Sequence, residues 1–262
     1  MSSLHYVNFP SLHERPLTIA ARLRVPEGGA ARHPAVVILH GSAGPSGREG
    51  GYARVLGEAG FATLEPDQWA PRKLAGGAQG RPRTVEETLG DVFGAKKFLS
   101  EHPQIDSTRI GLMGFSFGGI ATLLATTREN GEIFAPHTAF AAYMACYPVC
   151  WLYGSQRGFE LKNLVTAPIF ILTAALDEYD NDPRAGEILI ESLDKADRAS
   201  ITTRAMADCH HGFDMPGVDI LAEDPFANRG EGGKVTMRYN PHATTEAHRL
   251  AVEFFSAALR SH

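Results

Sequence analysis

The sequence predicts an α/β fold in which a mostly parallel central sheet is flanked by helices on both faces. Short apolar runs alternate with longer runs of helical period, as in sheets whose parallel strands are joined by helices. The run "AVVILHG" (35–41) is apolar almost throughout, which is typical of a strand buried on both faces. With 262 residues, 44% of them hydrophobic, the chain can bury one sizeable core. We therefore expect a single domain over residues 1–262.

The predicted elements follow one another along the whole chain. The predicted strands lie at 17–25, 35–41, 61–67, 109–115, 140–148, 168–176 and 201–209. The predicted helices lie at 52–60, 84–102, 183–197 and 244–260, with a further helical run after residue 116. Gly60 closes the first helix, and Thr84 and Glu87 have the spacing of a capping box at the start of the second.

Composition excludes several classes of protein. The formal net charge is −5 and no basic run is dense enough to form a phosphate-binding stripe, so we expect no nucleic-acid partner. The first residues lack the pattern of a signal peptide, and no apolar stretch is long enough to span a membrane. We expect a soluble, cytoplasmic protein with no membrane partner. Three cysteines are too few, and odd in number, for a disulfide framework.

Ser116 is the candidate nucleophile. It lies in "GFSFGG" (114–119), directly after a predicted strand and before the helix-forming run "IATLLATT". Glycines two residues to either side permit the tight strand-to-helix turn of a nucleophile elbow, in which a Cβ at those positions would clash. Such a turn presents the hydroxyl at the carboxyl end of the sheet, where ligands of open parallel sheets gather.

A serine needs a base, and the base needs an orienting acid. Asp177 follows the predicted strand 168–176, and His210 and His211 follow the strand 201–209. The order of serine, acid and histidine along the chain is that of the α/β hydrolases. Adjacent residues of an extended strand point to opposite sides, so only one of the two histidines can readily face Ser116.

Two alternatives compete with this assignment. Asp180 and Asp182 lie in the same loop as Asp177, which comes first after the strand. The run "CHH" (209–211) contains metal-ligand residue types, but metal sites gather ligands from several separated positions, and no matching pair appears elsewhere. We therefore expect no metal and no other cofactor.

The sequence resembles the dienelactone hydrolase-like family of the α/β-hydrolase superfamily over nearly its whole length. The motifs that carry the resemblance are "HGSAG" (40–44), "GFSFGG" (114–119), "LTAALDEYDNDP" (172–183) and "HGFD" (211–214). The resemblance implies Ser116 as nucleophile, Asp177 as acid and His211 as base, because "HGF" is the family's usual context for the base. The family's name-giving enzyme has a cysteine nucleophile, and the serine here resembles that of the family's serine esterases instead.

The turn "HGSAG" is the candidate oxyanion loop, because a glycine-bearing turn after a strand can aim backbone N–H groups at a developing negative charge. The resemblance implies the backbone N–H groups of Phe117 and Ser42 as donors. We interpret His40 as a structural histidine that braces this turn rather than as a group that transfers protons.

The substrate pocket is predicted from aromatic and basic residues near the strand ends. The candidates are Trp69, Arg72, Tyr147, Trp151 and Tyr179. The stretch from Pro148 to Pro168 is too short for a large cap domain, so we expect an open entrance with the segment 212–240 as its local cover.

These residues predict a serine hydrolase of carboxylic esters or lactones, with a small-molecule substrate and an acyl-enzyme intermediate. A peptidase or amidase on the same triad is the first alternative, and the lack of a gating domain in the sequence disfavours it. A non-catalytic ligand-binding protein of the same fold is the second. It is disfavoured because a binding module has no need of Ser, Asp and His at these three strand ends.

Overall fold

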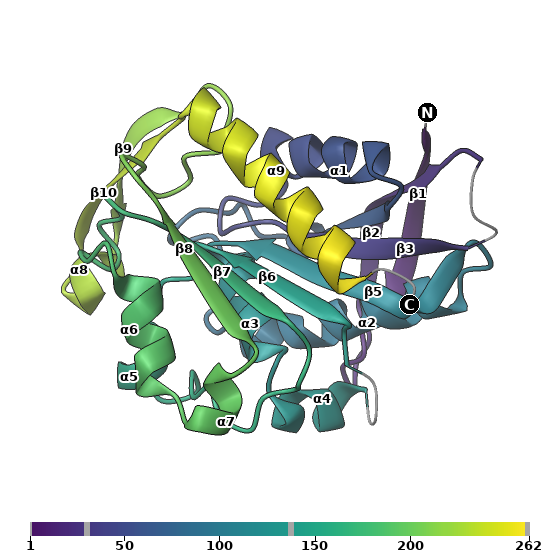
Figure 1. Cartoon of the computed structure of the whole chain (residues 1–262), viewed down its shortest axis with the longest axis horizontal. Helices are drawn as coiled ribbons and strands as arrows, with labels where there is room; N and C mark the ends of the chain where they lie inside the picture. Colours follow the sequence, from purple (N-terminus) through teal and green to yellow (C-terminus); the bar gives the residue numbers. More distant parts are fainter. Residues whose placement is uncertain (1, 29–31, 136–138, 260–262) are drawn as a thin grey trace.

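An eight-stranded sheet forms the centre of the molecule in the computed structural model, which describes residues 2–28, 32–135 and 139–259 (Figure 1). Its order is β1-β2-β4-β3-β5-β6-β7-β8. The strands are β1 (Ser2–Pro10), β2 (Thr18–Pro26), β3 (His33–Leu39), β4 (Ala62–Asp67), β5 (Ile105–Phe115), β6 (Ala142–Cys146), β7 (Ile169–Ala174) and β8 (Ile201–Met206). The pairings of β2 with β1 and β4 are antiparallel, and all others are parallel. The mostly parallel sheet expected from the sequence is confirmed.

Helices cover both faces of this sheet (Figure 1). On one face lie α1 (Gly47–Glu58) and α9 (Pro241–Ala258), and their apolar sides join Val36, Ile38 and Phe115 in one buried cluster. On the other face, α2 (Leu89–Glu101), α3 (Phe117–Leu124) and α6 (Ala185–Ser192) contribute to a second and larger cluster. The shorter helices of this side are α4 (Arg128–Phe134), α5 (Leu152–Ser155) and α7 (Lys195–Arg198). Burying both faces requires strands that are apolar throughout, as the run 35–41 predicts.

Two predicted helices differ from those observed. The helix expected over 84–102 begins at Leu89, and a single 3-10 turn (Glu86–Thr88) precedes it. Only half of the expected capping box forms: the Thr84 N–H donates to Glu87 Oε1, but the 3-10 turn begins after Val85 and has no side-chain cap. The helix expected over 183–197 is broken between Ser192 and Lys195 into α6 and α7. The last residue of the helix expected over 244–260 lies outside the described residues.

The segment after β8 contains an additional hairpin. Strands β9 (Asp219–Asp224) and β10 (Gly233–Arg238) pair in antiparallel register as a separate two-stranded sheet, joined through the short turn α8 (Ala227–Gly230). This hairpin lies within the segment 212–240 that the sequence suggests as local cover. The connection from β6 to β7 contains only the four-residue α5, so it forms no large cap.

The topology brings the carboxyl ends of the parallel strands together at one edge of the sheet. Ser116 follows β5, Asp177 follows β7 and His211 follows β8. The turn at 40–44 follows β3 at the same edge. Within the described part of the chain, no helix is long and apolar enough to cross a membrane.

Candidate active site

Ser116 occupies a strained turn between β5 and α3. Its backbone has φ 51° and ψ −114°, a conformation that residues other than glycine seldom adopt. The turn is tightly packed: a Cβ on Gly114 would lie 2.1 Å from the Gly118 carbonyl oxygen, and one on Gly118 would lie 2.5 Å from the His40 carbonyl oxygen. Only glycine fits at both positions, which is why the serine is flanked by them. The geometry is that of a nucleophile elbow.

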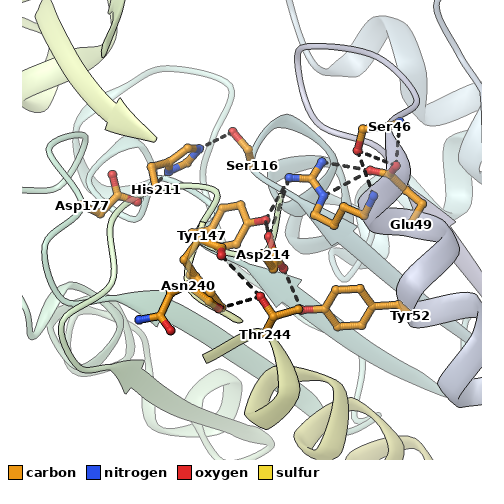
Figure 2. Close-up of polar contacts among 12 residues, drawn as sticks. Ser46, Glu49, Tyr52, Ser116, Tyr147, Asp177, His211, Asp214, Asn240 and Thr244 are labelled. Carbon is orange, nitrogen blue, oxygen red and sulfur yellow. Dashed lines mark hydrogen bonds and ion pairs between the residues drawn. The ribbon is translucent and has the colours of Figure 1, made fainter. Parts of the chain in front are cut away.

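Ser116, His211 and Asp177 form one hydrogen-bonded chain (Figure 2). His211 Nε2 lies 2.8 Å from Ser116 Oγ, and His211 Nδ1 lies 2.7 Å from Asp177 Oδ2. Asp177 also accepts a hydrogen bond from the Tyr179 N–H through its other oxygen, at 2.9 Å. Because a carboxylate only accepts, the proton of the imidazole is held on Nδ1, which leaves Nε2 free to accept the serine proton.

The competing residues lie elsewhere. Asp180 accepts the backbone N–H groups of Cys150 and Trp151 and has no hydrogen bond to His211. Asp182 accepts the N–H of Arg184, the residue before α6. The His210 ring lies 3.4 Å from the Glu178 carboxylate instead. The structure therefore brings together the three residues that the sequence predicts as the triad. The alternative residues Asp180, Asp182 and His210 have other hydrogen-bond partners.

The turn at 40–44 is braced from several sides. The carbonyl oxygen of Ser42 accepts hydrogen bonds from the Trp69 indole N–H, at 2.9 Å, and from the Gly77 N–H, at 2.8 Å. Phe117 is the first residue of α3, so its N–H has no acceptor within the helix. The Ser42 peptide is thus held through its carbonyl oxygen, and the Phe117 N–H lies directly after the elbow serine.

His40 is fully engaged in holding the same turn. Its Nδ1 lies 2.9 Å from the Gly41 carbonyl oxygen, and its Nε2 accepts the Gln68 N–H at 3.1 Å. Burial lowers the pKa of His40, so the ring stays neutral in this role. Both ring nitrogens are used by the backbone, which agrees with the interpretation of His40 as a structural residue.

The five expected pocket residues are distributed over different environments. Trp69 is buried and packs against His40 and Phe117. Arg72 is paired with Asp91 at 2.7 Å and also donates to backbone carbonyls. Trp151 lines a separate cavity between α5 and α6. Trp69 and Arg72 brace loops because their polar atoms bind partners away from Ser116. The buried Trp151 indole N–H has no hydrogen-bond partner in the part of the chain that the structure describes.

Tyr147 and Tyr179 hold the imidazole of His211 from two sides. Their ring centroids lie 4.8 Å and 4.5 Å from that of His211. Of the five expected pocket residues, Tyr179 alone is among the residues that line the cavity beside Ser116. The Tyr147 ring is buried instead, and its hydroxyl points away from the serine into the protein (Figure 2).

A buried polar network, which the sequence analysis did not anticipate, lies behind the base. Asp214, three residues after His211, accepts the hydroxyls of Tyr147, at 2.5 Å, and Tyr52, at 2.7 Å. Arg48 donates to the Tyr147 hydroxyl at 2.9 Å and is paired with Glu49 at 2.9 Å (Figure 2). The Arg48 guanidinium lies 4.3 Å from the ring centroid of Phe115, the residue before the nucleophile. The network thus joins α1, the end of β6 and the loop that carries His211.

Charges in this network are compensated by their neighbours. Burial lowers the pKa of Arg48, but Tyr147, Glu49 and Asp214 together raise it above its usual value, so Arg48 stays charged. Burial raises the pKa of Tyr52 well above its usual value, and the neighbouring Asp214 raises it further, so that hydroxyl stays protonated and donates. Removing one partner of such a buried ion pair would lower the free energy of unfolding by several kcal/mol, on the order of 3 to 5.

The cysteines take no part in this site. Cys146, Cys150 and Cys209 are buried free thiols. Burial raises the pKa of each, that of Cys209 to about 11, which makes them poor nucleophiles. Among the described residues, no group of three or more His, Cys, Asp or Glu side chains could hold a metal ion.

The fold and the site define an α/β hydrolase, with an elbow serine, a histidine and an aspartate at the carboxyl edge of a mostly parallel sheet. The model of the dienelactone hydrolase family matches residues 19–259, and the chain belongs to that family. No curated protein matches the sequence closely enough to count as a relative.

Solved structures of several hydrolases share the fold. The dienelactone hydrolase from Anabaena variabilis is 21% identical, with a TM-score of 0.66. The match covers 99% of this chain and 99% of that chain. Esterase 2 of Thermogutta terrifontis, phosphorylated by paraoxon, is 16% identical, with a TM-score of 0.67 and 98% and 94% covered. The acylaminoacyl peptidase of Pyrococcus horikoshii is 17% identical, with a TM-score of 0.65. The match covers 100% of this chain and 42% of the peptidase chain. At these identities the likeness establishes the fold alone.

Proposed function

We propose that this protein is a serine hydrolase of carboxylic esters or lactones that works through an acyl-enzyme. The observation that carries the proposal is the continuous chain from Asp177 through His211 to Ser116, with separations of 2.7 Å and 2.8 Å. These are the distances at which a base can take the proton of a nucleophile.

Each residue has a role that follows from its position. His211 Nε2 takes the proton of the Ser116 hydroxyl while Oγ attacks the carbonyl carbon of the ester. The oxyanion that forms is stabilised by the N–H groups of Phe117 and Ser42. The imidazolium then protonates the leaving alcohol oxygen, and Asp177 stabilises its positive charge. Water, deprotonated by His211, attacks the acyl-enzyme and returns Ser116 with release of the acid.

Hydrolysis of p-nitrophenyl acetate by the wild-type protein and by Ser116→Ala tests this proposal. We expect the variant to lose activity by a factor on the order of 10⁴ or more, because no other group can form the acyl-enzyme. Ser107→Ala is the matched control: this serine lies exposed on the same strand, β5, far from the turn. Equal activity in the wild type and in Ser116→Ala would contradict the proposal. An equal loss of activity in Ser116→Ala and Ser107→Ala would also contradict it.

Amide hydrolysis on the same triad is the second candidate. It is supported by the fold shared with the acylaminoacyl peptidase of Pyrococcus horikoshii. An amine is a poorer leaving group than an alcohol, so ester cleavage makes the smaller demand on this site. Comparing p-nitrophenyl acetate with p-nitroacetanilide decides between them: a kcat/KM for the anilide equal to that for the ester would favour an amidase.

A further inference from the structure

A small cavity lies directly beside Ser116. It has a volume of about 50 Å³ and is lined by Ser116, Phe117 and Ile120 at the start of α3. Its other walls come from the loop 81–85, from the region of α5 and from the β9–β10 hairpin. The nucleophile thus forms part of its wall, and any group in the cavity is next to the reacting carbonyl.

The position of the cavity relative to the base decides which part of an ester it receives. The leaving alcohol must lie next to His211 Nε2, because that atom donates the proton to it. Ser116 and the oxyanion donor Phe117 line the cavity, and Tyr179 separates it from the His211 ring, which is not among its lining residues in the part of the chain that the structure describes. The cavity therefore lies on the acyl side of the scissile bond.

The size of the cavity limits the acyl group. A cavity needs about 10 to 15 Å³ to hold one water molecule. A cavity of about 50 Å³ holds about three to five atoms of that size. This corresponds to an acyl chain of about two to four carbons, and a longer chain would have to displace a wall or leave through the open side of the cavity.

Most of the cavity wall is apolar. Val85, Val149 and Leu152 are buried in its wall, and Phe159 and Phe226 line it from surface segments. Arg81, Arg83 and Thr84 also line the cavity. The Arg81 guanidinium is bound by both oxygens of Asp224, at 2.8 Å and 3.0 Å, and Arg83 is exposed. The acyl chain itself therefore meets mainly apolar side chains.

The hairpin wall of the cavity is fixed to the body of the protein. Asp224 accepts the Tyr179 hydroxyl at 2.9 Å in addition to Arg81. The Arg81 guanidinium lies 5.2 Å from the ring centroid of Phe226. The Arg229 N–H donates to the Tyr179 carbonyl at 3.0 Å. These contacts hold Phe226 in place, so the size limit is built into the packed structure.

We propose that this cavity is the acyl-binding pocket, that Phe159 and Phe226 form its outer wall, and that the enzyme is thereby restricted to esters of short acyl groups. This inference rests on the proposed serine esterase function. It adds the substrate class and two residues that determine it.

The test is a series of p-nitrophenyl esters from acetyl to octanoyl, in which the leaving group is constant. We expect kcat/KM of the wild type to fall by about tenfold or more between butyryl and octanoyl, since one methylene in a fitted pocket is worth about 10-fold or more. In Phe159→Ala and Phe226→Ala the ratio of octanoyl to butyryl activity should rise by at least about fivefold, as each truncation removes part of the outer wall.

Leu221→Ala is the matched control, because Leu221 is an apolar residue of the same hairpin that is 59% exposed. It should leave the chain-length profile unchanged. A wild type that prefers octanoyl to butyryl, or a profile that neither phenylalanine variant changes, would overturn the pocket assignment while leaving the esterase function intact. No Ser116-dependent hydrolysis of any ester in the series would overturn the proposed function, and the pocket assignment with it.

Discussion

The two sides of Ser116 are built in opposite ways. On the base side, His211 is buried between two tyrosine rings and is backed by Asp177, while Asp214 and Arg48 form a sealed polar network behind it. On the acyl side, the cavity wall is mostly apolar, and part of it comes from surface segments such as Phe226, which is 40% exposed.

This difference separates the residues that determine rate from those that determine specificity. Buried polar groups that satisfy one another fix a single geometry, and the loss of any one leaves its partners unpaired. An apolar side chain of the cavity wall can be truncated without leaving a buried polar group unpaired. Substitutions on the base side should therefore slow all substrates alike, and those on the acyl side should redistribute activity among substrates.

Asp177→Asn should have the largest effect of these base-side changes. The amide can donate to His211 Nδ1 and so favours the tautomer with the proton on Nε2, which cannot accept the serine proton. We expect kcat to fall by a factor on the order of 10³ to 10⁴, equally for acetyl and butyryl esters. Steady-state kinetics on both esters measures this. Asp182→Asn, a change in the same loop, is the control and should retain activity.

Asp214→Asn should have a smaller effect of the same kind. The amide places an N–H₂ group against the hydroxyl donors of Tyr147 and Tyr52, so the loop that carries His211 loses its fixed position. We expect kcat to fall about 10-fold to 100-fold with KM unchanged, and the free energy of unfolding to fall by about 2 to 3 kcal/mol.

The matched control for this prediction is Asp219→Asn, which removes an exposed carboxylate paired with Arg238 on the surface. Tyr147→Phe keeps the ring against His211 and removes only the hydroxyl, so it should lose less activity than Asp214→Asn. A change in KM or in the chain-length profile of Asp214→Asn would break the proposed division between the two sides.

Asp180 should affect stability rather than turnover. Burial and the neighbouring Asp177 raise the pKa of Asp180 to about 6 in the folded protein. A raised pKa stabilises the folded protein at low pH, and this contribution is lost as the pH rises through about 6. Relative to Asp180→Asn, the wild type should lose about 2 to 3 kcal/mol between about pH 4 and 6 and be constant above.

Urea unfolding of both proteins across this pH range measures the difference, and ester hydrolysis at neutral pH provides the activity readout. Asp180→Asn should retain most of its activity, in contrast to Asp177→Asn. A parallel pH dependence of the two unfolding free energies would refute the role of Asp180 in this titration.

Much of the site could be predicted from the sequence because its signals are local. Ser116 is identified by flanking glycines and by the strand before it, and Asp177 and His211 lie just after apolar runs. Parallel strands bring such residues to one edge whatever the details of the loops. The same argument predicts the central strands, which are apolar throughout.

The remaining features depend on contacts between distant segments. Asp214 and Tyr52 are 162 positions apart, and nothing in the sequence near either residue indicates the other. Arg81 and Asp224 meet only because the hairpin folds back over the loop 81–85. Trp69 has the aromatic character expected of a pocket residue, yet its indole N–H is used by the Ser42 carbonyl. Residue type alone does not distinguish these roles.

The most direct test of the central claim is covalent trapping of the nucleophile. The wild-type protein would be incubated with paraoxon and digested, and its peptides analysed by mass spectrometry. The account predicts one diethyl phosphate per chain, on Ser116, and a strongly reduced rate of labelling in Asp177→Asn, in which His211 can no longer activate the serine. Labelling of another residue at a rate that Ser116→Ala does not change would contradict it.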